Sequence, residues 1–136
     1  MITKKKMMLL FYQNLGKICY AVAAADKEVH PLEHTKLKEL VKKHWLDTAI
    51  VKGTCSSNAA YHIELVFNSL NNKNNLDAHT CFKDFVAYKN LHKHLFTTKI
   101  RRLILKTTSE IAHAYSGINK SELIMLAKLD IELKKP

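Results

Sequence analysis

The feature that most constrains this chain is a short motif that occurs once near each end. Residues 22–33 read VAAADKEVHPLE, and residues 111–122 read IAHAYSGINKSE. Each copy has the pattern of an apolar helix end, a polar turn and a capped start to the next helix. A glutamate closes both copies, whereas Asp26 of the first copy is replaced by Tyr115 in the second. The repeat predicts a helical domain with pseudo-twofold internal symmetry, in which the two turns are available as a site.

The rest of the chain follows the helical period, because apolar residues recur at three- and four-residue spacing. Only 3 Gly and 2 Pro interrupt it, which favours helices joined by short polar loops. Leu32 and Leu91 are among the side chains expected to face inward. We therefore expect residues 1–136 to form one all-α domain, a bundle of about six to seven helices. Six helices are predicted, over residues 7–25, 31–45, 57–70 (with Ser57 as the cap), 77–95, 98–115 and 119–136.

Three carboxylates stand at the two turns. Asp26 ends an apolar helix, where the helix dipole does not favour a negative charge, so we expect it to accept hydrogen bonds from the amides of the turn. Glu33 and Glu122 lie at the third helical position, from which a carboxylate reaches back to the N-cap amide. Alternatively, if the two turns lie side by side, Asp26, Glu33 and Glu122 converge on a hard divalent cation such as Ca²⁺ or Mg²⁺.

A second metal hypothesis rests on histidines. His30 and His34 are four residues apart, a spacing that places two imidazoles on one helix face, as zinc sites use. However, His30 precedes the helix start, and the glutamate between the two histidines does not stand in the order HExxH that supplies a catalytic base. Zn²⁺ is therefore an alternative to Ca²⁺ or Mg²⁺, and no cofactor is certain.

Catalysis has little support in the sequence. It contains no Gly-rich phosphate loop, no nucleophile elbow and no Cys/His pair at a diagnostic spacing. We therefore predict that the protein is not an enzyme and takes no small-molecule substrate.

The formal net charge of +10 is the unusual global property of the chain, and it favours association with anions. We expect a protein partner, with an anionic membrane surface or a nucleic acid as alternatives. Only 2 of the 22 basic residues are Arg, the residue that makes most bidentate contacts with phosphate and guanine. Binding to nucleic acid by lysines alone would be non-specific and steeply salt-dependent. The candidate anion-binding residues are Lys36, Lys43, Lys99, Arg102 and Lys106, of which the last three share one helical face.

Cysteine usage and hydropathy bear on the compartment. The three cysteines, Cys19, Cys55 and Cys81, are odd in number and far apart, which indicates a reducing environment. No stretch approaches the ~20 apolar residues that span a bilayer. The sequence therefore predicts a cytoplasmic, soluble protein.

The segment Tyr20–Val29, with Ala25-Asp26 followed by Glu33 and Leu37, resembles the TerB-like family. That family includes the tellurite-resistance protein TerB and the amino-terminal region of DjlA-type co-chaperones. Its signature resembles A-x-A-D-G-x-[VI] with a glutamate further on, and it appears twice in an all-α fold of about this size. Lys27 stands where the family has glycine.

The resemblance implies a small cytoplasmic, non-catalytic binding or scaffold module of a stress-response system. It also implies that acidic residues from both repeats bind metal, here Asp26, Glu33 and Glu122. Because Tyr115 replaces the second aspartate, such a centre lacks one carboxylate. The alternative function is a basic protein that binds nucleic acid or an anionic membrane through lysine-rich helix faces.

Overall fold

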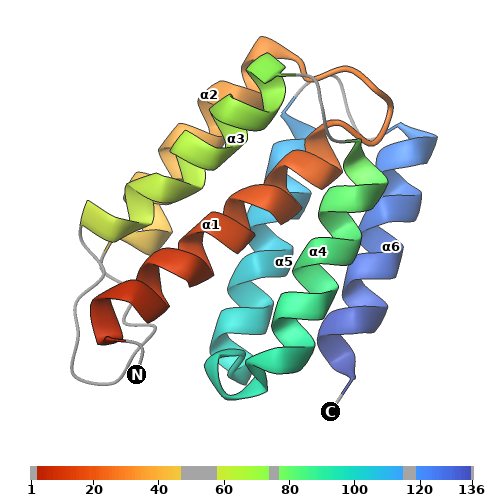
Figure 1. The fold of residues 1–136 in the computed structure, drawn as a ribbon. Helices are drawn as coiled ribbons and strands as arrows, with labels where there is room; N and C mark the ends of the chain where they lie inside the picture. Colours follow the sequence, from red (N-terminus) through yellow and green to blue (C-terminus); the bar gives the residue numbers. More distant parts are fainter. Residues whose placement is uncertain (1–2, 47–57, 74–76, 115–118, 136) are drawn as a thin grey trace.

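The computed structural model describes residues 3–46, 58–73, 77–114 and 119–135, and these form an all-α bundle (Figure 1). The predicted fold class is confirmed, and the described residues contain no strand. The predicted cap at Ser57 and the position of Tyr115 lie outside the described residues. The α-helices are α1 (Lys4–Ala23), α2 (Pro31–Leu40), α3 (His62–Lys73), α4 (Ala78–Leu91), α5 (Thr98–His113) and α6 (Lys120–Lys134). Three short helical turns accompany them: η1 (Val41–Trp45), η2 (Asn58–Tyr61) and η3 (Lys93–Leu95).

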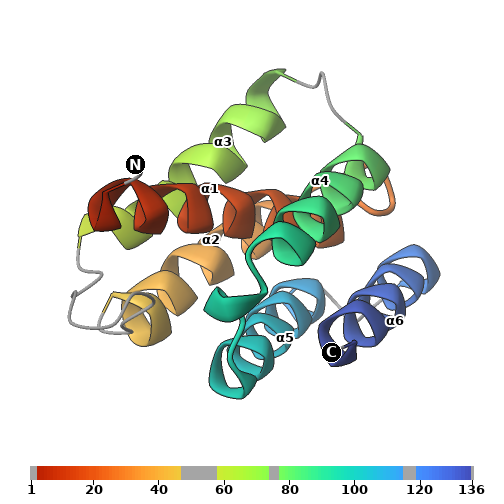
Figure 2. The ribbon, with the colours of Figure 1, turned by 60° about the horizontal axis from the view of Figure 1, so that its bottom comes forward.

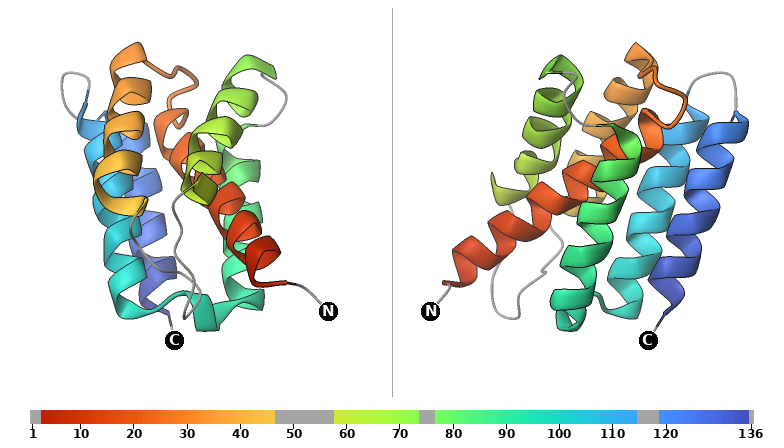
Figure 3. Two further views of the ribbon diagram at one scale, coloured as in Figure 1. Left: turned by 90° about the vertical axis from the view of Figure 1, so that its left-hand side faces the viewer. Right: turned by 45° about the vertical axis from the view of Figure 1, so that its right-hand side comes forward.

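Helix α1 is the centre of the bundle. Figure 2 shows it crossing the molecule, with α3 and α4 on one side, α2 and α5 on the other, and α6 at the edge beside α5. Figure 3 shows α5 and α6 running side by side along that edge. Residues 18–23 of α1 are buried consecutively, so this part of the helix is enclosed on all sides, and α1 contacts α3, α4, α5 and α6. No helix within the described residues is long and apolar enough to cross a lipid bilayer.

The core joins α1 to η1 and α5 through aromatic residues. Phe11 and Tyr12 pack against Trp45, with ring centroids 6.3 Å and 6.4 Å from the indole. All three side chains are buried, and the Trp45 Nε1–H donates to Thr107 Oγ1 at 3.0 Å. The bond matters because a buried N–H without an acceptor is costly. Trp45 therefore fixes η1 against α5.

A glycine allows α1 and α3 to lie close together. A Cβ atom added at Gly16 would lie 2.8 Å from the carbonyl oxygen of Ile63 and 2.9 Å from the Cβ of Val66. Real Cβ atoms do not approach neighbours this closely. Only a residue without a side chain allows this approach of the two helices.

Two cations hold the carboxyl end of α6 against the bundle. Lys89 is 1% exposed, and its Nζ donates to the Glu132 carbonyl at 2.6 Å and lies 3.6 Å from the Glu132 carboxylate. Arg101 donates to the carbonyls of Leu133 and Lys135. Arg101 thereby gives partners to carbonyls at the end of α6, whereas the Glu132 carbonyl also accepts from the Lys135 N–H at 3.3 Å. Burial lowers the pKa of Lys89, whereas its pairing with Glu132 opposes that shift.

Two expected core residues lie at the surface, and each has a local reason. Leu91 is 78% exposed because α4 ends at this residue, and Leu95 of η3 takes the buried position instead. Leu32 is 54% exposed because it lies at the second position of α2, where the chain has only just entered the helix. The predictions that Leu32 and Leu91 face inward were therefore wrong.

Candidate functional site

The turn between α1 and α2 contains a strained residue. Lys27 has φ 70°, the one positive value at a non-glycine residue in the described part of the chain. Its N–H donates to the Ala24 carbonyl at 2.8 Å, which ends α1. A side chain in this left-handed region costs about 1–2 kcal/mol. The conformation explains why a glycine suits this position in the motif that the sequence resembles.

Both predicted capping glutamates are in place. The His30 N–H donates to Glu33 Oε1 at 2.9 Å, and the Asn119 N–H donates to Glu122 Oε1 at 3.3 Å. Asn119 completes its box by accepting from the Glu122 N–H at 2.9 Å. The two helices therefore begin with capping boxes, and Pro31 stands at the first position of α2. Both glutamates are buried, with 1% and 3% of their surface exposed.

The structure brings the turn after α1 and the start of α6 together, as the cation hypothesis required. The Asn119 side-chain amide donates to Asp26 Oδ2 at 2.6 Å, while Asp26 Oδ1 accepts from the Glu28 N–H at 3.0 Å. The second bond confirms that Asp26 accepts from an amide of its own turn. The carboxyl groups of Glu33 and Glu122 are hydrogen-bonded to each other. We call this group, Asp26, Glu33, Asn119 and Glu122, the carboxylate junction.

Glu33 is the protonated member of the junction at neutral pH. Burial and the hydrogen bond with Glu122 raise the pKa of the Glu33 carboxyl to about 8. The negative charges of Glu122 and Asp26 act in the same direction, and the bond from the His30 N–H opposes them. A proton between the two glutamates therefore lets both carboxyl groups be buried without mutual repulsion.

The junction is acidic, but its oxygens already have partners. Among the residues that the structure describes, no group of three or more His, Cys, Asp or Glu side chains has the arrangement of a metal site. The two histidines proposed as zinc ligands have different structural roles. His30 is the N-cap of α2, and the ring of His34 stacks on Phe67 of α3, with centroids 5.8 Å apart. The carboxylate oxygens suit a hard cation, which would have to displace the proton between the two glutamates.

Sequence periodicity correctly placed three cations on one surface. Lys99, Arg102 and Lys106 are exposed on α5 and surround an open hollow of about 400 Å³. The half-buried Leu103 and the exposed Thr98 complete its lining. Within the described residues, no carboxylate lies within ion-pair distance of these three cations. We call Lys99, Arg102, Leu103 and Lys106 the α5 basic face.

The other two candidate anion-binding residues, Lys43 and Lys36, differ in their relation to the α5 basic face. Lys43 is exposed on η1, and with Lys106 it helps lower the pKa of His44, after the larger effect of burial. Lys43 therefore extends the positive field of the α5 basic face. Lys36 instead lies 3.6 Å from the carboxylate of Glu39. Lys36 also does not line the hollow of the α5 basic face.

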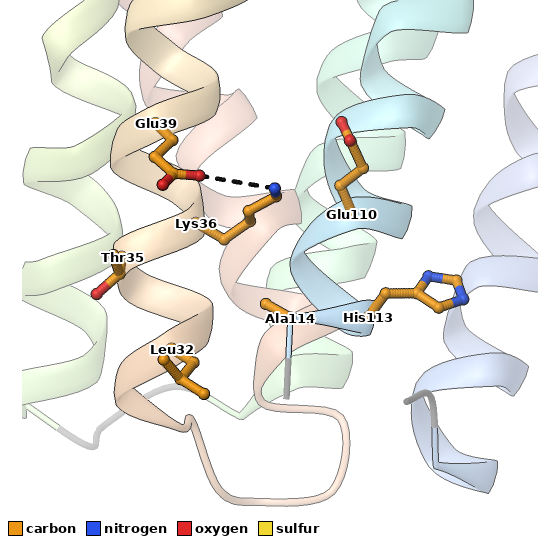
Figure 4. Close-up of a pocket in the computed structure, with 7 residues that line it drawn as sticks. All are labelled: Leu32, Thr35, Lys36, Glu39, Glu110, His113 and Ala114. Atoms are coloured by element: carbon orange, nitrogen blue, oxygen red, sulfur yellow. Dashed lines mark ion pairs between the residues drawn. The ribbon is translucent and has the colours of Figure 1, made fainter. Parts of the chain in front are cut away.

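Lys36 lines a second surface feature, a cleft of about 340 Å³ between α2 and α5 (Figure 4). Its Nζ points toward Glu39, Glu110 stands opposite on α5, and His113 is directed away from α2 (Figure 4). The His113 Nδ1 lies 2.8 Å from the Ser109 carbonyl, so this nitrogen carries a hydrogen. The cleft thus mixes both signs of charge, unlike the α5 basic face.

Sequence reasoning did not identify two residues that matter at these sites. Asn119 caps α6, and its side-chain amide also binds Asp26. Arg101 was not among the candidate cations, and its bonds to the end of α6 were not anticipated. Residue spacing could separate Arg101 from Arg102, since they point about 100° apart on a helix. It could not show which neighbour each side chain meets.

No family model, curated protein or solved structure compared with the chain matches it. The TerB-like resemblance therefore stays a prediction that rests on the two motifs.

Proposed function

We propose that the protein is a non-catalytic binding module that docks an acidic protein partner on the α5 basic face. The observation that carries this proposal is the set of three exposed cations around a half-buried leucine, with no carboxylate paired to them among the described residues. Following the TerB-like resemblance, we place the module in a cytoplasmic stress-response system of the tellurite-resistance type.

The rest of the surface supports this choice of face. Several lysines outside this face are ion-paired, among them Lys17 with Asp84 and Lys134 with Asp130. The first turn of α5 contains no acidic residue, so the positive end of its helix dipole adds to the field of the cations. The carboxylate junction, in contrast, buries the carboxyl groups of Glu33 and Glu122, which suits a structural role better than contact with a substrate. These features favour binding over catalysis.

Fluorescence anisotropy with labelled poly-L-glutamate tests this function. The variant Lys99→Glu/Arg102→Glu/Lys106→Glu should lose at least tenfold in affinity at low salt, because it reverses the field of the face. The control Lys83→Glu/Lys120→Glu/Lys128→Glu makes the same change of net charge at exposed lysines outside that face. Equal losses in both variants would show that total charge, and not this face, governs binding.

A divalent cation at the carboxylate junction is a second candidate, which the contact between Glu33 and Glu122 favours. Since the ion would replace the shared proton, its binding should strengthen as pH rises past about 8, the pKa of Glu33. Ca²⁺ or Mg²⁺ at 100 times its dissociation constant should add about 2.7 kcal/mol to the free energy of unfolding.

Thermal unfolding after chelation tests this second candidate at pH 6.5 and pH 8.5. The cation should raise the melting temperature by several degrees at the higher pH. The Glu33→Gln variant should lose that increase. An equal increase in the variant, or none in the wild-type protein, would refute a cation site at the junction.

A further inference from the structure

The α5 basic face lies beside a second hollow. This second hollow, of about 280 Å³, lies between α5 and α6. Arg102 and Thr98 line both hollows, so Arg102 stands between them. Leu103 contributes to the first hollow, and Leu105 with Leu133 to the second. The surface therefore presents apolar side chains on both sides of a cation, and more cations at its margins.

We infer that the partner on this surface is an acidic amphipathic helix, which places apolar side chains in the two hollows and carboxylates against Lys99, Arg102 and Lys106. This inference rests on the proposed function and specifies the partner's structure. Charge complementarity selects an acidic occupant, since no Asp or Glu is among the described residues that line either hollow.

The arrangement of the hollows favours a helix over an irregular acidic chain. Helices pack by placing side-chain ridges in the grooves beside a partner's ridge, and the two hollows flank the ridge that carries Arg102. A partner helix presents anchors at i, i+3, i+4 and i+7, which suits the helix-in-groove mode of recognition. Its acidic residues lie at the edges of that apolar stripe, where they meet Lys99, Lys106 and the exposed part of Arg102.

The surrounding structure can support such a contact without rearrangement. Arg101 is held by the Phe96 carbonyl at 2.8 Å and by carbonyls at the end of α6, so the second hollow has a fixed wall. Ile100 and Ile104 are buried on the opposite side of α5 and anchor that helix in the core. A rigid docking surface loses little conformational entropy on binding.

The test uses two labelled synthetic peptides of one composition, rich in Leu and Glu, measured by fluorescence anisotropy with the full chain. One peptide places Leu at helical anchor positions, and the other is scrambled to remove the periodicity. The amphipathic peptide should bind at least tenfold more tightly, because each buried leucine contributes about that factor. Equal affinities would overturn the inference.

Changes in the hollows locate the contact. Leu103→Ser should reduce the preference for the amphipathic peptide at least threefold, and Leu65→Ser, at a leucine 57% exposed on α3, should leave it unchanged. If Leu103→Ser does not fold, replacing successive leucines of the peptide by serine gives the same comparison on the wild-type protein. An unchanged preference in these comparisons would overturn the inference.

Other outcomes separate this inference from the proposed function. Binding of poly-L-glutamate but of neither peptide overturns only the helical partner. Failure of all three acidic ligands to bind overturns the proposed function as well. Tighter binding to phosphatidylserine vesicles or to poly-uridine RNA than to the amphipathic peptide would replace the acidic helix by a membrane or a nucleic acid.

Discussion

The side-chain amide of Asn119 donates to the carboxylate of Asp26 at 2.6 Å, and so joins two residues that lie 93 positions apart in the sequence. Each residue also has a local task, since Asp26 accepts from the Glu28 N–H and Asn119 caps α6. The bond therefore connects the local structure of one motif copy to that of the other. Glu33 and Glu122 make a second connection directly beside it.

A double-mutant cycle should detect this connection. Asp26→Ala removes the acceptor, and Asn119→Ser removes the amide donor while keeping an oxygen that can cap α6. We expect a coupling energy of about 0.5–1.5 kcal/mol from urea unfolding, a value typical of a partly exposed hydrogen bond. Additive effects of the two substitutions would mean that the bond contributes nothing to stability.

The shared proton predicts an unusual dependence of stability on pH. The pKa of Glu33 is about 8 in the folded protein, against 4.5 for an ordinary glutamate. Between these values the folded state holds a proton that the unfolded state has lost, so stability falls as pH rises through this window. The slope for one proton is at most about 1.4 kcal/mol per pH unit.

Glu33→Gln should abolish that slope, because the amide is neutral at every pH and can still donate to Glu122. Chemical unfolding at pH 5, 6, 7 and 8 measures the slope of the free energy of unfolding against pH for both proteins. The variant should gain stability relative to the wild-type protein as pH rises. Parallel curves for the two proteins would contradict the assignment of the proton to Glu33.

Lys27 predicts a stabilising substitution. Lys27→Gly relieves the left-handed conformation but gives the unfolded chain more freedom, so we expect a net gain of roughly 0.5–1 kcal/mol in the free energy of unfolding. Glu28→Gly is the matched control, because Glu28 is exposed in the same turn and does not have a positive φ. A loss of stability in the Lys27 variant would refute strain at this position.

Substitution of Gly16 should instead lower the free energy of unfolding. Alanine in place of glycine inside an exposed helix usually stabilises it by about 1 kcal/mol. Here the added methyl group would meet the Ile63 carbonyl and Val66, so Gly16→Ala should cost roughly 1–3 kcal/mol in thermal or urea unfolding. A stabilised variant would show that α1 and α3 are not packed as closely as this.

The sequence was most informative where structure depends on neighbouring residues in the chain. Spacing placed Pro31, Glu33 and Glu122 at the starts of their helices, and it grouped Lys99, Arg102 and Lys106 on one face. These features follow from the 3.6-residue period and from capping, which are local properties. Such local features were enough to predict most of the fold and part of the candidate site.

Contacts between distant segments could not be predicted in the same way. The proton between Glu33 and Glu122 depends on how closely two buried helix starts approach, which no spacing encodes. The exposure of Leu91 depends on where α4 ends and on Leu95 filling the core in its place. Both are decided by tertiary packing, which overrides the local pattern.

Amide chemical-shift mapping of the isotope-labelled protein with poly-L-glutamate tests the central claim most directly. The account predicts that the largest changes occur along residues 98–106 of α5 and at Lys43, and that they disappear in the variant with Lys99, Arg102 and Lys106 replaced by glutamate. The exposed lysines Lys83, Lys120 and Lys128 should shift little. Changes centred on those lysines, or spread evenly over all exposed lysines, would contradict the account.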